Sequence, residues 1–329
     1  MSLNQLPRLL AEMPEFKRII SDINKNGDTN LKIQLMSEAI PFILAGLSLF
    51  DNKTIMVLVS KPEDARVLYD QLLIWIDKKT QLILFPETEN MPFERIVPDV
   101  SVGQDRLRGL RAIADIGNTP TIVIASNTAI SQKTINRNLF EHNFHRLTVG
   151  EEIILEEVIE SWIRLGYVME TMTETMGSFS RRGGILDVFP VDSAYPCRIE
   201  LMGNEIDSIR RFDPENQLSL DKVDSVQIFP AKETLPSMSE DHKFRNLMQN
   251  IDMSNCTDQV KQRFDEEINL LHRGSYIDNS DFYSGLFQDG SVFDYLPDKT
   301  IVIKVNSNEL DRVQSDRDER ICKIRRIKE

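Results

Sequence analysis

The amino-acid sequence predicts an α/β protein in which a domain built on a parallel sheet is interrupted by a smaller, β-rich α+β insert domain. Short apolar, β-branched runs alternate with helical patterns through residues 31–125, which is typical of a parallel sheet covered by helices. From residue 166 the pattern changes to short alternating strands with tight turns. The 329 residues are enough for two or three domains.

The elements of the first segment follow from apolar periodicity. An amphipathic helix is expected at 15–27, where apolar residues recur at helical spacing before Gly27. The expected strands are 31–35, 54–60, 81–85 and 119–125. The expected helices between them are 38–49, 62–76 and 103–116. A further helix with mixed charges is expected at 312–329.

Charge and composition exclude several classes of protein. The chain has 39 basic and 52 acidic residues, a net charge of −13, whereas a protein that coats nucleic acid is normally basic. The longest apolar run, 39–50, is too short to span a bilayer, and no secretion leader opens the chain. The cysteines are far apart, at Cys197, Cys256 and Cys322. They are expected to be reduced thiols, which predicts a cytoplasmic protein.

The uneven distribution of charge predicts the domain boundaries. Residues 1–143 carry 16 basic and 17 acidic residues, residues 144–231 carry 8 and 16, and residues 232–329 carry 15 and 19. The middle segment therefore holds most of the negative charge. We expect 1–143 to form the first part of the α/β domain and 144–231 the β-rich insert. Residues 232–329 should then form the second part of the α/β domain and a connecting helix.

The loop after the first expected strand is where a parallel sheet would hold a nucleotide phosphate. A phosphate-binding loop needs glycines, a Lys and a Ser or Thr for Mg²⁺. Residues 36–40 read M-S-E-A-I, in which only Ser37 fits and Glu38 would repel a phosphate. No Gly-Lys dipeptide occurs in the sequence. The sequence predicts a motor-like fold that has no Walker A loop and no ATP site.

Two other polar patterns give no indication of catalysis. The acidic run at 265–267 follows no apolar strand and is expected on a solvated helix face. His142 and His145 have the spacing of metal ligands but no third ligand nearby. We therefore expect no catalytic residue, no metal and no cofactor in this chain.

The middle segment should begin with an acidic helix at 151–164. Strands are expected at 166–171, 177–182, 185–189, 197–202, 205–212 and 223–229. Gly203 and Asn204 tolerate positive φ and predict a two-residue hairpin turn. Pairing outward from this turn sets Leu201 opposite Ile206, Ile199 opposite Ser208 and Glu200 opposite Asp207.

Two opposed acids on a hairpin repel each other unless cations lie nearby. The candidate cations are Arg181, Arg182, Arg210 and Arg211. Arg198 also lies on the face of Glu200, two residues away. One interpretation is a solvated charge network within the chain, worth about 0–1 kcal/mol per pair. The other is a polar docking surface that pairs with another protein. The residues by themselves favour the first.

Several runs resemble a known family. The middle segment resembles the UvrB-homology module, which UvrB shares with the bacterial transcription-repair coupling factor Mfd. The similarity is strongest in three runs: G-S-F-S-R-R-G-G-I-L-D-V-F-P (177–190), P-C-R-I-E-L-M-G-N-E-I-D-S-I-R-R-F-D (196–213) and I-F-P-A-K-E (228–233). Residues 85–99, 106–111 and 121–126 are similar to the first domain of that family. Residues 283–297 are similar to the segment that follows in Mfd.

Two features favour Mfd over UvrB. UvrB would carry an intact phosphate loop near residue 36 and an aromatic-rich, DNA-gripping hairpin near 85–99, where this chain has only Phe85 and Phe93. The resemblance therefore implies a degenerate RecA/helicase-like domain (no Walker A) with a UvrB domain 2-like insert. It also implies a longer parent protein, an ATP-dependent DNA translocase whose ATP and Mg²⁺ bind in motor domains outside these residues.

In that family the β-rich domain binds UvrA, the damage-recognition ATPase of nucleotide excision repair. The family's contact positions correspond to Arg182, Arg198 and Glu200, with Phe189 as a nearby apolar contact. An arginine can hold a partner carboxylate in a bidentate pair. Two positions depart from this pattern: Met169 stands where the family is expected to have arginine, and Ser180 stands where UvrB tends to have arginine. Arg181 is expected to substitute in part for an arginine at 180.

The resemblance implies a non-catalytic module that recruits UvrA to RNA polymerase stalled at DNA damage in the bacterial cytoplasm. We expect a monomer with no membrane contact, whose parent binds RNA polymerase and double-stranded DNA through other domains. Arg182→Ala or Arg198→Glu should abolish UvrA binding and leave stability nearly intact. The alternatives are a UvrB-like ATP-dependent damage-processing subunit and a direct DNA-binding module. They predict saturable ATP binding and salt-dependent duplex binding, respectively.

Overall fold

The chain forms two compact units. The computed structural model describes residues 3–25, 31–50, 53–88, 99–235, 246, 248, 250–273, 275 and 280–328. The first unit comprises Met1–Glu87, Gly109–Gln132 and Tyr295–Glu329, and the second comprises Thr88–Arg108 and Lys133–Asp294. Most of the run at 85–99 that is similar to the family's first domain, residues 89–98, lies outside the described residues.

The first unit is built on a parallel sheet, as the sequence predicts. Its strands are β1 (Ile55–Val59), β2 (Gln81–Phe85), β3 (Thr121–Ser126) and β12 (Ile301–Lys304). They are hydrogen-bonded in the order β12-β1-β3-β2, and every pairing is parallel. Every residue of β1 and β3 is buried, which explains their continuous apolar sequences, because such a sheet is covered on both faces.

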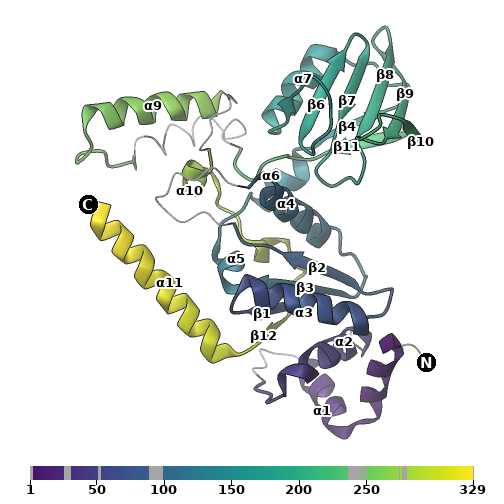
Figure 1. Ribbon diagram of the computed structural model, residues 1–329, viewed down its shortest axis with the longest axis vertical. Helices are drawn as coiled ribbons and strands as arrows, with labels where there is room; N and C mark the ends of the chain where they lie inside the picture. Colours follow the sequence, from purple (N-terminus) through teal and green to yellow (C-terminus); the bar gives the residue numbers. More distant parts are fainter. Residues whose placement is uncertain are drawn as a thin grey trace. The chain divides into compact units, whose positions relative to one another are not determined.

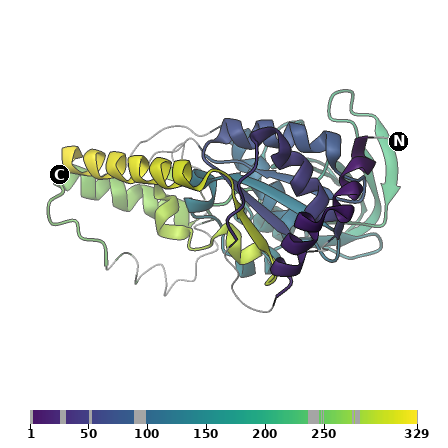
Figure 2. The same cartoon turned by 90° about the horizontal axis from the view of Figure 1, so that it is seen from below.

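Helices cover one face of this sheet and form the core of the unit with it. They are η1 (Leu3–Glu12), α1 (Pro14–Ile23), η2 (Ser37–Ala39), α2 (Ile40–Phe50) and α3 (Pro62–Trp75). Val57 and Ile124 of the sheet share one apolar cluster with Phe16, Leu44 and Leu68 of these helices. Figure 1 and Figure 2 show these purple and blue helices gathered beside the strands.

Three further helices contribute to this part of the chain. They are α4 (Val100–Ala114), α5 (Asn127–Ser131) and α11 (Ser307–Lys328). Gly109 of α4 allows a close approach to β2, because a Cβ atom at this position would lie 3.1 Å from the Phe85 ring. Ser126 caps α5 by accepting a hydrogen bond from the Ala129 amide, at 3.0 Å. No described helix is both long and apolar enough to cross a bilayer.

The strand predicted at 31–35 is wrong. Residues 31–36 lie outside any strand, and Leu31, Ile33 and Leu35 are exposed. Alternating apolar residues allow a strand, but only pairing with a neighbour satisfies its backbone groups. The first strand is instead β1, so the loop to inspect for a phosphate site is 60–62, which reads S-K-P. It contains no glycine, and its proline lacks the amide that a phosphate would need.

The second unit holds a six-stranded sheet. Its strands are β5 (Val168–Met169), β6 (Ser178–Arg182), β7 (Ile185–Val188), β8 (Cys197–Met202), β9 (Glu205–Phe212) and β10 (Ser219–Val223). Neighbours follow the order β10-β9-β8-β7-β6-β5, and only β5 and β6 pair in parallel. The sequence did not predict β10. The strand predicted at 223–229 is shorter, β11 (Ser225–Ile228), and it pairs with an unpredicted strand, β4 (His145–Thr148), in a separate sheet.

One face of the six-stranded sheet is apolar and packs on α7 (Leu155–Arg164), beside the sheet in Figure 1. Trp162 of α7 meets Phe179 of β6 edge to face, with ring centroids 5.4 Å apart. Leu186, Ile199 and Ile209 are buried and share the face of Phe179 by strand register. Burial of this face stabilises the sheet, so the opposite face is available for polar contacts.

The remaining helices of the second unit follow in the chain. They are α6 (Arg137–His142), α9 (Asp258–His272), η4 (Ser280–Tyr283), α10 (Ser284–Phe287) and η5 (Val292–Tyr295). The acidic run at 265–267 lies on α9, as predicted, and Glu267 there accepts a hydrogen bond from Arg263 Nε at 2.6 Å. Among the described residues no group of three or more acidic, His or Cys side chains could hold a metal ion.

The second unit extends beyond residue 231. In the structure it continues to Asp294. Glu233 accepts a hydrogen bond from the buried Arg106 Nε at 2.6 Å, and Gln288 Nε2 donates to Thr234 at 2.9 Å. These bonds hold the segment beyond residue 231 within the second unit. The domain boundaries expected from charge, at 144 and 231, stay predictions.

Candidate protein-docking site

The hairpin of β8 and β9 determines which side chains face one another. Leu201 lies opposite Ile206, as predicted, but a β-bulge shifts the register from Glu200 onward. Glu200 lies opposite Ser208, so the predicted pairs Glu200–Asp207 and Ile199–Ser208 are wrong. The bulge places Asp207 outside the paired register, which removes the repulsion that two opposed acids would cause.

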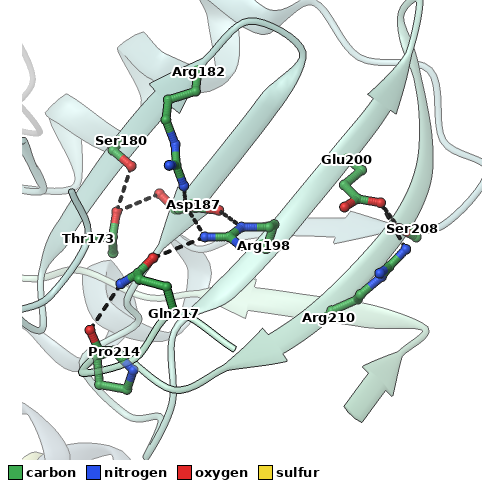
Figure 3. A network of polar contacts seen from close by, with 10 residues as sticks. All are labelled: Thr173, Ser180, Arg182, Asp187, Arg198, Glu200, Ser208, Arg210, Pro214 and Gln217. Carbon is green, nitrogen blue, oxygen red and sulfur yellow. Dashed lines mark hydrogen bonds and ion pairs between the residues drawn. The ribbon is translucent and has the colours of Figure 1, made fainter. Parts of the chain in front are cut away.

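The polar face is the side of the six-stranded sheet opposite to α7. By strand register and alternation it carries Ser180, Arg182, Ile185, Asp187, Arg198, Glu200, Met202, Glu205, Ser208, Arg210 and Lys222. Most of these side chains are shown in Figure 3, where they form two separate clusters of polar contacts. Three of the predicted partner-binding residues, Arg182, Arg198 and Glu200, therefore share one face.

Asp187 is the centre of the first cluster. Its side chain is only 1% exposed and accepts hydrogen bonds from two arginines. Arg198 binds it in a bidentate pair, Nε to Oδ1 at 2.8 Å and Nη2 to Oδ2 at 2.9 Å. Arg182 Nη2 donates to Oδ2 at 2.9 Å. A buried carboxylate needs such partners, and it fixes both guanidinium groups in return.

Besides Asp187, Arg198 contacts the Phe212 ring and the Gln217 side chain. Its guanidinium lies 4.5 Å from the centroid of the Phe212 ring, and its Nη2 donates to Gln217 Oε1 at 3.1 Å. Gln217 Nε2 in turn donates to the Pro214 carbonyl at 3.0 Å. The hydrogen bonds to Asp187 raise the pKa of Arg198 above its ordinary value. The Arg198 side chain is 16% exposed, whereas that of Arg182 is 51% exposed and is the more accessible of the two.

Glu200 belongs to the second cluster. Its Oε2 accepts hydrogen bonds from Ser208 Oγ at 2.8 Å and from Arg210 Nη2 at 3.0 Å. The Glu200 and Arg210 side chains are about one-third exposed, so a partner can reach both. The structure thus contains the charge network within the chain that was the favoured interpretation of the sequence. Its geometry also meets the requirement of a docking surface, because charged groups are held in place at the solvent boundary.

Two predicted contact residues are not accessible on the polar face. Arg181 lies on the face of α7, with Nη1 3.7 Å from Oε1 of Glu156, because successive strand residues point to opposite faces. Phe189 follows β7 and donates a backbone hydrogen bond to the Ser178 carbonyl, but the residue is only 5% exposed. A role of either residue in partner binding stays a prediction.

The two departures from the family pattern have different structural settings. Ser180 is buried, and its hydroxyl accepts a hydrogen bond from Thr173 Oγ1 at 3.0 Å. An arginine would not fit there unless Thr173 moved. Arg181 cannot replace it on the polar face, since it points the other way. Met169 is 54% exposed on β5, the edge strand, so an arginine could replace it without repacking.

The cysteine in this sheet has no features of a nucleophile. Cys197 is buried on the apolar face, and burial raises the pKa of its thiol to about 11. A thiol with such a pKa stays protonated at neutral pH and is inert. The polar face, on the other side of the sheet, consists of paired charges and hydrogen bonds, which can serve recognition.

Comparison with known proteins gives this segment a family. Residues 145–233 match the family model of the UvrB interaction domain, a range that includes every strand of the six-stranded sheet. The predicted resemblance is confirmed. The chain is similar over most of its length to proteins named transcription-repair-coupling factor, and the match to the interaction domain covers the insert.

Three curated relatives illustrate this similarity. The chain is 26% identical over 314 residues to the transcription-repair-coupling factor of Bacillus subtilis, which covers 92% of this chain and 26% of the relative. It is 23% identical over 260 residues to that of Haemophilus influenzae, covering 78% and 22%. It is 30% identical over 236 residues to that of Staphylococcus aureus, covering 69% and 20%. The chain thus spans about a fifth to a quarter of the length of these relatives.

Proposed function

We propose that this chain recruits UvrA, and with it nucleotide excision repair, to RNA polymerase stalled at DNA damage. The observation that carries the proposal is the polar face: predicted contact residues from two strands are held together by one buried carboxylate, inside the segment that matches the UvrB interaction domain. The region acts as a non-catalytic module. The motor activity and the contacts with RNA polymerase and DNA belong to other parts of the parent protein.

The geometry supports binding because the Arg182 side chain is already fixed by Asp187, so its ordering costs little conformational entropy when a partner binds. Arg182 uses one Nη2 contact to Asp187, and among the described residues its Nε and Nη1 groups have no hydrogen-bond partner. These N–H groups belong to a half-exposed side chain and can donate hydrogen bonds to a carboxylate of UvrA. An arginine that is already fixed by a buried acid loses less rotamer freedom on binding than a free one.

The decisive variant is Arg182→Ala, with Arg146→Ala as its matched control. Arg146 is an exposed arginine on β4, within the same family segment but away from the polar face. We expect Arg182→Ala to weaken UvrA binding about 10-fold or more, because hydrogen bonds to charged groups contribute about 1.5–3 kcal/mol. Its free energy of unfolding should change by less than about 1 kcal/mol, because the pair is half exposed and Arg198 still holds Asp187.

Binding is measured by titration of purified UvrA against the chain, and stability by urea unfolding. Equal UvrA affinity of the wild type and Arg182→Ala would overturn the proposal. Arg198→Glu, which the sequence suggests as an alternative, is a poorer test: it would set a second carboxylate against the buried Asp187 and destabilise the sheet. Saturable ATP binding by this chain would instead favour a UvrB-like enzyme.

A further inference from the structure

A row of cations crosses the polar face beyond the predicted contact residues. Arg198 of β8 lies directly opposite Arg210 of β9, and Arg210 lies directly opposite Lys222 of β10. Directly opposed side chains of paired antiparallel strands are about 4.5–5.5 Å apart at their Cβ atoms, and like charges in such pairs destabilise a sheet. Three cations in one row therefore represent a cost to folding that needs an explanation.

Acids in the chain compensate this row only in part. Asp187 neutralises Arg198, and Glu200 accepts a hydrogen bond from Arg210. Arg210 Nε is buried without a hydrogen-bond partner, and Lys222 is exposed with no partner among the described residues. The row itself holds three cations and one carboxylate, Asp187, whereas Glu200 and Glu205 lie on the same face nearer the hairpin turn. The excess of positive charge grows toward β10, the edge strand of the sheet.

This excess contrasts with the charge of the insert. Residues 144–231 contain 8 basic and 16 acidic residues, yet half of the basic ones lie on the polar face. Asp213, in the nearby 213–218 loop, is engaged within that loop. Asp213 accepts hydrogen bonds from the Glu215 amide at 2.8 Å and from Asn216 Nδ2 at 3.0 Å. Positive charge is thus concentrated on one face of an acidic segment.

We propose that the docking surface extends across Arg210 and Lys222 to the β10 edge, and that its occupant is an acidic segment of the partner protein. This inference rests on the proposed function, and it specifies the chemistry of the UvrA segment that binds. The Cβ atoms of residues i and i+4 of a helix are about 5–6 Å apart, close to the Cβ spacing along the row. Such a segment can set two successive carboxylates against Arg210 and Lys222.

The charges favour a protein partner over nucleic acid. Glu200 and Asp187 lie between the cations, and a phosphate backbone, which has only negative groups, would be repelled by the accessible Glu200. A protein segment can place a cation or a donor opposite Glu200 and acids opposite the row. Charge complementarity of this kind increases the association rate and excludes other partners.

Lys222→Glu tests this inference, and Arg146→Glu is its matched control. Both changes reverse one exposed charge in the insert, and Lys222 has no partner in the described chain whose loss would impair folding. We expect Lys222→Glu to weaken UvrA binding about 10-fold at low salt, mainly through a slower association rate. The difference should shrink as salt is raised, since screening weakens exposed charge contacts. Arg146→Glu should bind within about 2-fold of the wild type.

The outcomes separate this inference from the proposed function. If Lys222→Glu binds UvrA as the wild type does while Arg182→Ala does not, the extension to β10 is overturned and the proposed function stands. If neither change affects binding of UvrA, both fail. Low-salt duplex DNA binding that Lys222→Glu abolishes, with UvrA binding unchanged, would assign the row to nucleic acid and overturn the inference. Lys222→Arg, which keeps the charge, should bind UvrA normally.

Discussion

The two sheets of this molecule use their residues in opposite ways. In the parallel sheet every residue of β1 and β3 is buried, so both faces of these strands contribute to stability. In the six-stranded sheet only one face packs on a helix, and the other carries paired charges at the solvent boundary. The difference shows where binding can evolve. In a strand buried on both faces every side chain packs in the core, whereas in a sheet buried on one face every second side chain can contact a partner.

The comparison predicts that the largest loss of stability follows from a change in the parallel sheet. Ile124 of β3 is 0% exposed and belongs to the main apolar cluster. Ile124→Ala should lower the free energy of unfolding by about 2–5 kcal/mol, because a cavity replaces the lost methyl groups. Ile124→Val should cost about 0.5–1.5 kcal/mol. Urea unfolding measures both, and an Ala variant as stable as the Val variant would contradict a tightly packed sheet.

A change at the centre of the polar face should cost less but still be large. Asp187→Asn keeps the size of the side chain but removes the charge that neutralises Arg198 and Arg182. We expect a loss of about 2–3 kcal/mol, because hydrogen bonds to charged groups are lost and Arg198 remains largely buried. Asp207→Asn, at the exposed bulge on β9, should change stability by less than about 0.5 kcal/mol. Equal losses for both variants would mean that Asp187 does not organise this face.

The same contrast explains what the sequence could predict of the fold. Apolar, β-branched runs identify β1, β2 and β3, because strands buried within a parallel sheet require apolar residues along their length. Residues 31–35 have a similar pattern but form no strand, since pairing depends on distant partners that local sequence does not reveal. β10 was missed because it is an exposed edge strand, S-L-D-K-V, without apolar alternation facing a core.

The candidate site was predictable in its members but not in its geometry. The resemblance identified Arg182, Arg198 and Glu200, which the structure places on one face. Period-two alternation alone could have excluded Arg181 from that face. The role of Asp187 was not apparent, because a lone acid in an apolar strand gives no sign of its partners. The bulge beside Glu200 also escaped prediction, since the hairpin turn fixes the register only as far as the first irregularity.

The smallest predicted effect concerns the loop that covers Arg198. Gln217 has a φ of +61°, in the left-handed region that costs an L-residue about 1–2 kcal/mol, and its side chain bonds Arg198 and Pro214. Gln217→Ala loses these hydrogen bonds and keeps the strain. Gln217→Gly loses the same bonds but relieves the strain, so it should be more stable than the Ala variant by about 1 kcal/mol.

The order of stability should reverse at Glu215, in the same loop, which is not among the residues with positive φ. There the Gly variant should be less stable than the Ala variant by about 0.5–1 kcal/mol, since glycine gains no relief from strain and loses more entropy on folding. Urea unfolding of the four variants measures both differences. If Gly were the less stable residue at both positions, the left-handed conformation of Gln217 would carry no strain. Arg198 would then be held by its partners at no backbone cost, and the polar face would differ from the buried sheet in its charges alone.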